Sequence, residues 1–327
     1  MQPKRYLEFV IASGKGGVGK STVSSTLILY LHRRYGNVIA LDADADAPNL
    51  HLIFNVAKWD FEKPYVASKT AYIIREKCVD CGLCADACVF NAVKEINGHY
   101  IIDEVLCEGC ATCAYVCPTR AIKLRTSESG KVRIVKTKYG FTLISAELNV
   151  GKPNTGKLVT EEKKLARKIA QNNSLVIVDS AAGIGCQVIA SIAGSNLAIL
   201  VVEPTLASFS DFKRVYKLTI HFRIPSVLVI NKYDINESFL RIIEEYASSE
   251  NIEILGYIPY DDIVPKSMTM LKPLIEVFPN SKASKALLNV AKGVEEIYVN
   301  WDSWKAKHMP RRYTPYMPKI IKPSKIY

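Results

Sequence analysis

Short runs of apolar residues alternate with longer helical patterns along most of the chain. Continuous apolar runs are typical of strands that are buried on both faces. The strand patterns fall at residues 6–12, 37–41, 175–178, 196–203, 226–231 and 253–257, and the clearest helical patterns at residues 20–35 and 156–170. Strands that alternate with helices favour a parallel sheet covered on both faces. The pattern therefore predicts an α/β fold with a doubly wound, mostly parallel sheet.

A cysteine-rich segment interrupts this pattern. It occupies about residues 68–125, and two further strand patterns, at residues 132–135 and 141–148, follow it. Within the segment, Asn97-Gly98 between apolar residues is a strong signal for a β-hairpin. We expect residues 1–67 and 126–300 to form the α/β domain, residues 68–125 a small inserted α+β domain, and residues 301–327 a basic, proline-rich arm.

Composition narrows the class of protein. The chain has 327 residues, of which 49% are hydrophobic and 23% charged, and this balance is typical of a globular protein. Its longest apolar runs, such as residues 197–202, are too short to cross a bilayer. No cationic and apolar leader precedes the first strand. We therefore expect a cytoplasmic protein that does not insert into a membrane.

The net charge of +11 is concentrated at the C-terminal end. Residues 303–327 contain seven Lys or Arg, four Pro and no Asp or Glu. Because proline opposes the continuation of a helix or strand, we expect the tail after Trp301 to form an extended arm that docks on its own domain or on an acidic partner. A basic arm with tyrosines can bind nucleic acid, but no recognition fold accompanies it, so nucleic acid is not an expected partner.

The segment after the first strand carries the most specific motif. Residues 13–22 are SGKGGVGKST, which matches the phosphate-binding loop G-x-x-x-x-G-K-[ST] between a strand and a helix. Lys20 is expected to reach the β- and γ-phosphates of a nucleotide, and Ser21 to ligate Mg²⁺. The loop residues expected around the phosphates also include Gly14, Gly16, Gly17, Val18, Gly19 and Thr22. The motif predicts a nucleotide site at the N-terminus of the first helix.

Acidic residues follow two other strands. Asp42 and Asp44 come directly after the strand at 37–41, and Asp179 ends the strand at 175–178. An aspartate at the end of a buried strand is a Walker B pattern, and the D-x-x-x-G from Asp179 to Gly183 looks like a switch II segment. We expect Asp179 to hold Mg²⁺ through water and the Gly183 amide to meet the γ-phosphate.

A second lysine in the loop, Lys15, indicates a particular family. GKGGVGKST resembles the deviant Walker A motif of the MinD/ParA/Mrp/nitrogenase-iron-protein group of dimeric P-loop ATPases, and the resemblance covers about residues 5–295. It implies a nucleotide-dependent homodimer in which Lys15 crosses to the phosphates held by the partner. It also implies that Asp42 lies near the water shell of Mg²⁺ and that Asp44 positions the attacking water. Lys15, Lys20 and Asp44 are then the catalytic residues.

Asn231-Lys232-Tyr233-Asp234, after another strand, is the candidate for recognition of the base. It matches the N-K-x-D with which GTPases accept guanine, where the aspartate bonds the ring N–H groups. In the MinD-like group, however, an asparagine at this place contacts adenine. Because the P-loop resembles the ATPase version, we expect ATP, with GTP as the alternative.

Eight of the nine cysteines form two runs of identical spacing, C-x₂-C-x₂-C-x₃-C. In a cytoplasmic chain such runs indicate metal rather than disulfides. The spacing is that of bacterial two-cluster ferredoxins, in which the fourth cysteine of each run ligates the other cluster. One [4Fe–4S] cluster is then expected on Cys78, Cys81, Cys84 and Cys117, and the other on Cys107, Cys110, Cys113 and Cys88.

Two zinc ribbons are the competing interpretation of the cysteines, although zinc sites usually have two separated C-x₂-C pairs. Val89 departs from the ferredoxin pattern, because a proline often follows the fourth cysteine. The ninth cysteine, Cys186, lies beside the switch II segment. We expect it to be a small buried residue, with a thiol at a dimer interface or a transient metal ligand as the alternative.

The two domains together resemble the MinD-like branch of ATPases with an inserted ferredoxin. This resemblance favours an ATP-gated redox protein, in which ATP closes a dimer and the inserted clusters pass electrons to a client protein. An iron–sulfur or metal-centre carrier with the clusters as cargo is the first alternative. A ParA-like positioning protein that binds DNA through the basic arm is the second, although the ferredoxin has no use there.

Overall fold

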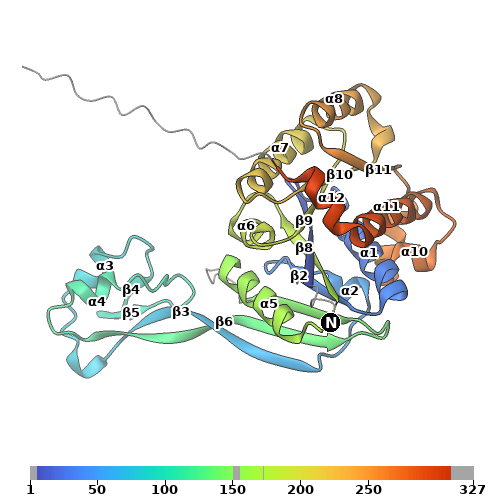
Figure 1. Ribbon diagram of the computed structural model, residues 1–327. Helices are drawn as coiled ribbons and strands as arrows, with labels where there is room; N and C mark the ends of the chain where they lie inside the picture. Colours follow the sequence, from blue (N-terminus) through green and yellow to red (C-terminus); the bar gives the residue numbers. More distant parts are fainter. Residues whose placement is uncertain (1–5, 150–154, 172, 311–327) are drawn as a thin grey trace, which may run out of the picture.

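The computed structural model describes residues 6–149, 155–171 and 173–310, and nine strands in these ranges form one sheet (Figure 1). The order is β11-β10-β9-β1-β8-β2-β7-β6-β3. Neighbouring strands from β11 to β7 are parallel, whereas β6 and β3 are antiparallel to their neighbours. The bounds are β1 Tyr6–Ser13, β2 Val38–Ala43, β3 Phe61–Ile73, β6 Ile122–Lys136, β7 Thr142–Leu148, β8 Ser174–Ala182, β9 Leu197–Val202, β10 Ser226–Asn231 and β11 Glu253–Ile258.

Helices cover both faces of the sheet, and each face has its own apolar core. One core includes side chains of α1 Lys20–Tyr35, α2 Leu50–Ile53, α10 Leu274–Val277 and α11 Lys282–Val299, with α9 Ile263–Thr269 beside it. The other includes side chains of α5 Thr155–Ile169, α6 Cys186–Ile192, α7 Leu206–His221 and α8 Glu237–Ser249. The prediction of a mostly parallel α/β sheet is therefore confirmed. Among the described helices, none has the length and apolar character needed to span a bilayer.

The insert is a small lobe at the end of a long two-stranded arm (Figure 1). Strands β3 and β6 pair along most of their lengths and run from the sheet into the lobe. The strand predicted at residues 132–135 is thus only the end of a strand of 15 residues. The lobe contains η1 Arg75–Lys77, α3 Leu83–Asp86, β4 Val93–Ile96, β5 His99–Ile102 and α4 Thr112–Val116. The hairpin predicted at Asn97-Gly98 joins β4 to β5.

The start of the C-terminal tail differs from the prediction of an extended arm. Residues Trp301–His308 form helix α12, and Trp301 is buried against Phe9 of β1. Residues 301–308 contain no proline, and the first proline of the tail is Pro310, so no proline opposes the helix. The extended-arm prediction is therefore wrong for residues 301–308, and its remaining part, residues 311–327, lies outside the described residues.

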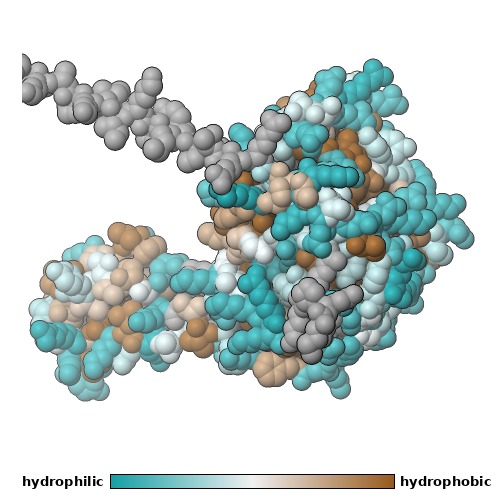
Figure 2. All heavy atoms as spheres, viewed as in Figure 1, coloured by the Kyte–Doolittle hydropathy of each residue, from teal (hydrophilic) through white to brown (hydrophobic). Residues whose placement is uncertain are grey.

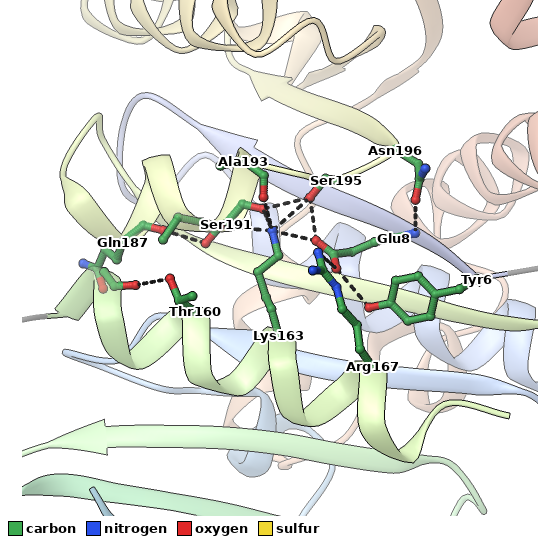
Figure 3. A network of polar contacts seen from close by, with 12 residues as sticks. Tyr6, Glu8, Thr160, Lys163, Arg167, Gln187, Ser191, Ala193, Ser195 and Asn196 are labelled. Atoms are coloured by element: carbon green, nitrogen blue, oxygen red, sulfur yellow. Dashed lines mark hydrogen bonds and ion pairs between the residues drawn. The ribbon is translucent and has the colours of Figure 1, made fainter. Parts of the chain in front are cut away.

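A buried ion pair fixes α5 to the sheet and to α6 (Figure 3). Lys163 Nζ lies 2.6 Å from Glu8 Oε1, and both side chains are almost fully buried. The same ammonium donates to the carbonyls of Ala190, Ser191 and Ala193 at the C-terminal end of α6. Burial lowers the pKa of Lys163, and the charge of Glu8 opposes this shift. Removing one partner from such a pair costs about 3–5 kcal/mol, so α5 and α6 are held together as one unit.

The preceding residue of α5, Glu162, is fully buried against the same sheet. Neither carboxyl oxygen of Glu162 has a hydrogen-bond partner among the residues that the structure describes. Burial raises the pKa of Glu162 well above its usual range, and the charge of Asp42 raises it further, while the nearby Ala146 backbone opposes the shift only in part. The folded state therefore binds this proton more tightly than the unfolded state does. As the pH rises above the unfolded value of about 4.3, this carboxyl costs stability, at about 1.4 kcal/mol per pH unit up to the folded pKa.

Glu162→Gln should consequently raise the melting temperature at neutral pH, because the amide has the shape of the protonated acid and carries no charge. The gain should shrink as the pH falls and vanish near the unfolded pKa of about 4.3. Thermal unfolding followed by circular dichroism from acidic to neutral pH measures it. Glu161→Gln, on the exposed side of the same turn, is the matched control and should show no such gain. A Glu162→Gln variant that melts below the wild type at neutral pH would contradict this account.

Candidate nucleotide-binding site

The phosphate-binding loop joins β1 to α1 through conformations that favour glycine. Gly17 and Gly19 have φ angles of 76° and 97°. A Cβ on Gly19 would lie 2.3 Å from Asn231 Nδ2, and a Cβ on Gly14 would lie 2.3 Å from the backbone of Asp211. Any larger residue at positions 14 and 19 would therefore displace the strand ends and helices that pack on the loop.

The loop forms one side of a cavity of about 460 Å³, a volume in the range of small-molecule sites. The loop side is lined by Gly16, Gly17, Gly19, Lys20, Ser21 and Thr22. The facing side is lined mainly by Asn231, Lys232, Pro259, Tyr260, Val264, Met268 and Leu287. Amides and a lysine at one end and apolar side chains at the other suit a molecule with a phosphate end and a flat heterocyclic end.

Parallel pairing brings two acidic strand ends beside the loop. Asp42 of β2 is opposite Asp179 of β8 in the register, and both are buried. Asp179 Oδ1 accepts a hydrogen bond from Ser24 Oγ at 2.7 Å. Asp42 Oδ2 accepts hydrogen bonds from the N–H groups of Asn49 and Leu50, each at 2.8 Å. Ser24 near the start of α1 and the segment after β2 thus orient the two carboxyl groups.

Burial raises the pKa of these acidic groups. For Asp179 the charge of Lys20 and a hydrogen bond from Ser21 oppose the effect of burial on the pKa. For Asp42 the charge of Asp179 adds to burial, and its pKa lies well above the usual range. Burial also raises the pKa of Asp44, which lines the cavity. Neighbouring carboxylates repel one another when both are ionised and therefore need a positive charge between them. A hard divalent cation such as Mg²⁺, which prefers oxygen ligands, could supply that charge.

Two of the residues expected at the site have protein partners in this structure. The Gly183 N–H donates to the carbonyl of Ser13 at 3.0 Å, because β8 runs beside β1 to its end, and so this amide is not free. Asp234 Oδ1 accepts from the Tyr260 N–H at 2.7 Å, and Asp234 is not among the residues that line the cavity. Asn231 does line the cavity, and its Nδ2 donates to the carbonyl of Val18 at 2.7 Å.

Lys15 forms an ion pair within its own chain. Its Nζ lies 3.4 Å from Glu203 Oε1, and its side chain is 43% exposed. Lys232 Nζ lies 2.9 Å from Glu203 Oε2 and donates to the carbonyl of Gly17 at 3.1 Å. Burial disfavours the ionised form of Glu203, but hydrogen bonds and charges from Lys232 and Lys15 lower its pKa overall. An ion pair with one exposed partner contributes little stability, so Lys15 can leave Glu203 at small cost.

Glu203 is not among the site residues expected from the sequence, and Lys232 is named there only as part of the N-K-x-D motif, without a role of its own. Both follow buried strands, β9 and β10, whose carboxyl ends meet at the edge of the sheet where the cavity lies. That position is the signal that could have identified them. The expectation of a buried Cys186 is wrong, because this residue begins α6 and is exposed.

The cysteines of the insert line two separate cavities. One is lined by Cys78, Cys81, Cys84 and Cys117, and the other by Cys88, Cys107, Cys110 and Cys113. These sets coincide with the two that the spacing predicts. In the described part of the chain, no three His, Cys, Asp or Glu side chains form a group that could hold a metal ion.

Backbone N–H groups of the arm and lobe point at three of these sulfurs. They belong to Ala71, Ala92 and Ala121, which donate to the Sγ atoms of Cys107, Cys88 and Cys117 at 3.4, 3.3 and 3.2 Å respectively. A Cβ on Gly109 would lie 2.1 Å from the carbonyl oxygen of Lys69. The backbone of the second cysteine run therefore packs directly on β3, at a distance that leaves no room for a side chain at position 109. The two runs are thus held against the ends of β3 and β6.

Comparison with known proteins identifies the family. The family model described as CbiA, the CobQ/CobB/MinD/ParA nucleotide binding domain, matches residues 9–274. The uncharacterized protein MJ0578 of Methanocaldococcus jannaschii is 33% identical over 290 residues, which cover 89% of this chain and 97% of that protein. The antiactivator FleN of Pseudomonas aeruginosa is 25% identical over 311 residues, covering 92% of this chain and 88% of that protein.

Solved structures show the same fold. The septum site-determining protein MinD of Pyrococcus horikoshii, in complex with Mg-ADP, has a TM-score of 0.56 and 18% identity, and the match covers 90% of this chain and 97% of that chain. The family model, the relatives and the structural similarity agree with the strand–loop–helix geometry of the cavity. The chain belongs to the CobQ/CobB/MinD/ParA family of nucleotide-binding proteins.

Proposed function

We propose that this protein is a Mg²⁺-dependent ATPase that couples its nucleotide state to a two-cluster ferredoxin insert, for ATP-gated electron transfer to a client protein. One observation carries the proposal: the arm of the insert is part of the sheet that forms the nucleotide cavity. Strand β6 pairs with β7, β7 pairs with β2, and Asp42 at the end of β2 is opposite Ser145 of β7. A shift of the strand ends at the cavity therefore has a continuous hydrogen-bonded path to the arm.

The cavity suits ATP better than GTP. The amides of the loop and Lys20 would hold the phosphates, and the apolar side chains of Val264, Met268 and Leu287 would pack on the base. Recognition of guanine by N-K-x-D needs a free carboxylate, but Asp234 is engaged by the Tyr260 N–H. Asn231 remains as a polar group that lines the cavity.

Hydrolysis requires charge stabilisation and a positioned water, because phosphoryl transfer leaves little other chemistry to the protein. Ser21, Asp179 and Asp42 would hold Mg²⁺ and its water shell. The charge of the metal ion would stabilise the ionised form of both carboxyl groups. Asp44 lines the cavity and would position the attacking water. Lys15 would leave Glu203 and reach the phosphates of a second copy, where it would neutralise charge that develops in transfer.

The arrangement of cysteines supports two [4Fe–4S] clusters. Each cavity has four cysteines from both runs, three from one and one from the other. A single zinc ion would need its sulfurs within about 3.8 Å of one another, given Zn–S distances of about 2.3 Å, whereas a cubane separates its thiolates more widely. N–H donors to cysteine sulfur stabilise the ligands and tune the potential of such clusters. When bound, the clusters would supply one-electron transfer between a donor and a client.

The surface of the lobe supports docking of a client protein. Figure 2 shows hydrophobic side chains on the outside of this lobe. Val89 is 83% exposed and Tyr115 is 92% exposed, and each lies next to or between cysteines of a run. Exposed apolar and aromatic side chains are typical of protein interfaces.

A positioning function is the second candidate, because the relatives include proteins named antiactivator and septum site-determining protein. Positioning, electron transfer and cluster carriage place different requirements on the insert. Positioning requires only the nucleotide cycle and a binding surface, whereas gated electron transfer requires eight cysteines that hold iron. A carrier function would require clusters that leave the protein.

Metal analysis of protein purified without oxygen tests the cluster proposal. We expect about eight irons and about eight acid-labile sulfides per chain, as two cubanes require. Cys117→Ser should reduce the iron content by about half, because it removes a ligand from one cluster only. Cys186→Ser is the matched control and should retain all the iron. About two zinc ions per chain without labile sulfide would overturn the proposal.

The role of Lys15 is tested by dimerisation. Asp44→Ala should bind ATP without hydrolysing it, and this variant should dimerise with ATP because two nucleotides at an interface attract the opposing lysines. Adding Lys15→Ala should weaken the dimer, and Lys15→Ala alone should lower the rate by about 10³-fold. Sedimentation velocity and phosphate release measure these effects, with the exposed Lys285→Ala as control. A monomeric Lys15→Ala enzyme that hydrolyses ATP at the wild-type rate would exclude this mechanism.

A further inference from the structure

A second, larger cavity lies outside the nucleotide site. It is a groove of about 950 Å³ that is lined by side chains of α5 and of the first half of β3. Figure 1 shows these two elements where the arm leaves the sheet. The strand side includes Phe61, Lys63, Tyr65 and Val66, and the helix side includes residues 157–168 of α5. None of the nucleotide or cysteine residues lines this groove.

The rim of the groove is strongly basic. Lys157, Lys164 and Lys168 lie on one face of α5, and Lys63 faces them from the strand side. The acidic lining residue is Glu161, which forms an ion pair of 2.6 Å with Lys164. Within the described residues, the other three lysines have no carboxylate within ion-pair distance. The excess of positive charge along the groove is complementary to an anionic partner.

The interior of the groove is apolar. Tyr65 and Val132 are buried in its floor, and Leu165 of α5 is half-buried beside them. Phe61 and Val66 are 49% and 51% exposed at its strand side. Large apolar side chains that remain half exposed between lysines mark a surface that other apolar groups can cover.

We infer that this groove binds an acidic, amphipathic segment of a partner polypeptide. The lysine rim spans about 16 Å along α5 from Lys157 to Lys168, at 1.5 Å per residue. This length matches a short peptide better than a compact metabolite. The apolar floor disfavours nucleic acid, and the lining includes no Arg for bidentate phosphate contacts and one Glu that would repel phosphate. Acidic side chains of the segment would pair with the lysines while its apolar side chains cover Tyr65 and Leu165.

This inference does not depend on the clusters, because the groove consists of side chains from the sheet and α5. Its position at the base of the arm would place the partner next to both domains. A partner bound there would contact β3 and α5 together, and α5 is joined to α6 by the Lys163 network (Figure 3).

Selection from a phage-displayed library of random peptides, panned against the full chain, tests the inference. The selected peptides should be enriched in Asp and Glu between apolar residues. A fluorescent copy of one selected peptide is then titrated in an anisotropy assay. The triple variant Lys157→Glu, Lys164→Glu and Lys168→Glu should weaken its binding at least about tenfold, because three rim charges reverse sign.

A matched control separates the groove from general electrostatics. Lys217→Glu, Lys285→Glu and Lys292→Glu change the net charge equally at exposed positions of α7 and α11, and should leave the affinity nearly unchanged. If the charge reversal impairs folding, the milder Lys157→Gln, Lys164→Gln and Lys168→Gln variant replaces it, and ATP binding verifies that each variant is folded. Selected peptides without acidic enrichment, equal loss in the control, or stronger competition by a DNA oligonucleotide than by the acidic peptide would overturn the inference.

Discussion

The parallel pairing of β1, β8 and β2 is the constraint on which the site depends. Hydrogen bonds between these strands fix Ile11 opposite Asp179 and Asp179 opposite Asp42. Because parallel strands all end at the same edge, the phosphate-binding loop and both carboxylates meet there, although they are far apart in the sequence. The glycines at positions 14 and 19 then allow the loop to pack directly on the neighbouring elements. A cavity with loop residues and Lys20 on one side and mainly apolar side chains on the other, close to two buried carboxyl groups, follows from this pairing.

The insert extends the same constraint to a second domain. Two antiparallel strands are added to the sheet beyond β7, and they continue outward as the arm that carries the cysteines. The chain returns through β7 to α5, whose Lys163 binds the end of α6, the helix that follows β8. The insert is therefore joined by strand pairing to the sheet that borders the cavity, and helix α5, which follows β7, is joined to α6 by buried polar contacts.

The sequence predicted the elements whose chemistry demands particular residues at particular spacings. The phosphate-binding loop needs glycine, lysine and serine in order, and the cysteine runs need fixed intervals, so both were recognisable from residues alone. The lengths of β3 and β6 were not, because an exposed two-stranded arm alternates polar and apolar residues without a continuous apolar run. Helix α12 was missed because the prolines that follow it dominated the composition of the tail, although Trp301 packs into the core. The ion pair of Lys15 with Glu203 joins residues far apart in the sequence, and only the fold brings them together.

The central claim is that the nucleotide state of the cavity reaches the cysteine-rich lobe. An anaerobic reduction titration of the full chain, with and without ATP, tests it most directly in the Asp44→Ala variant, where ATP would remain unhydrolysed. The account predicts that ATP shifts the reduction potential of the clusters, and that the shift is lost when Lys20→Ala removes nucleotide binding. Identical potentials with and without bound ATP would contradict it.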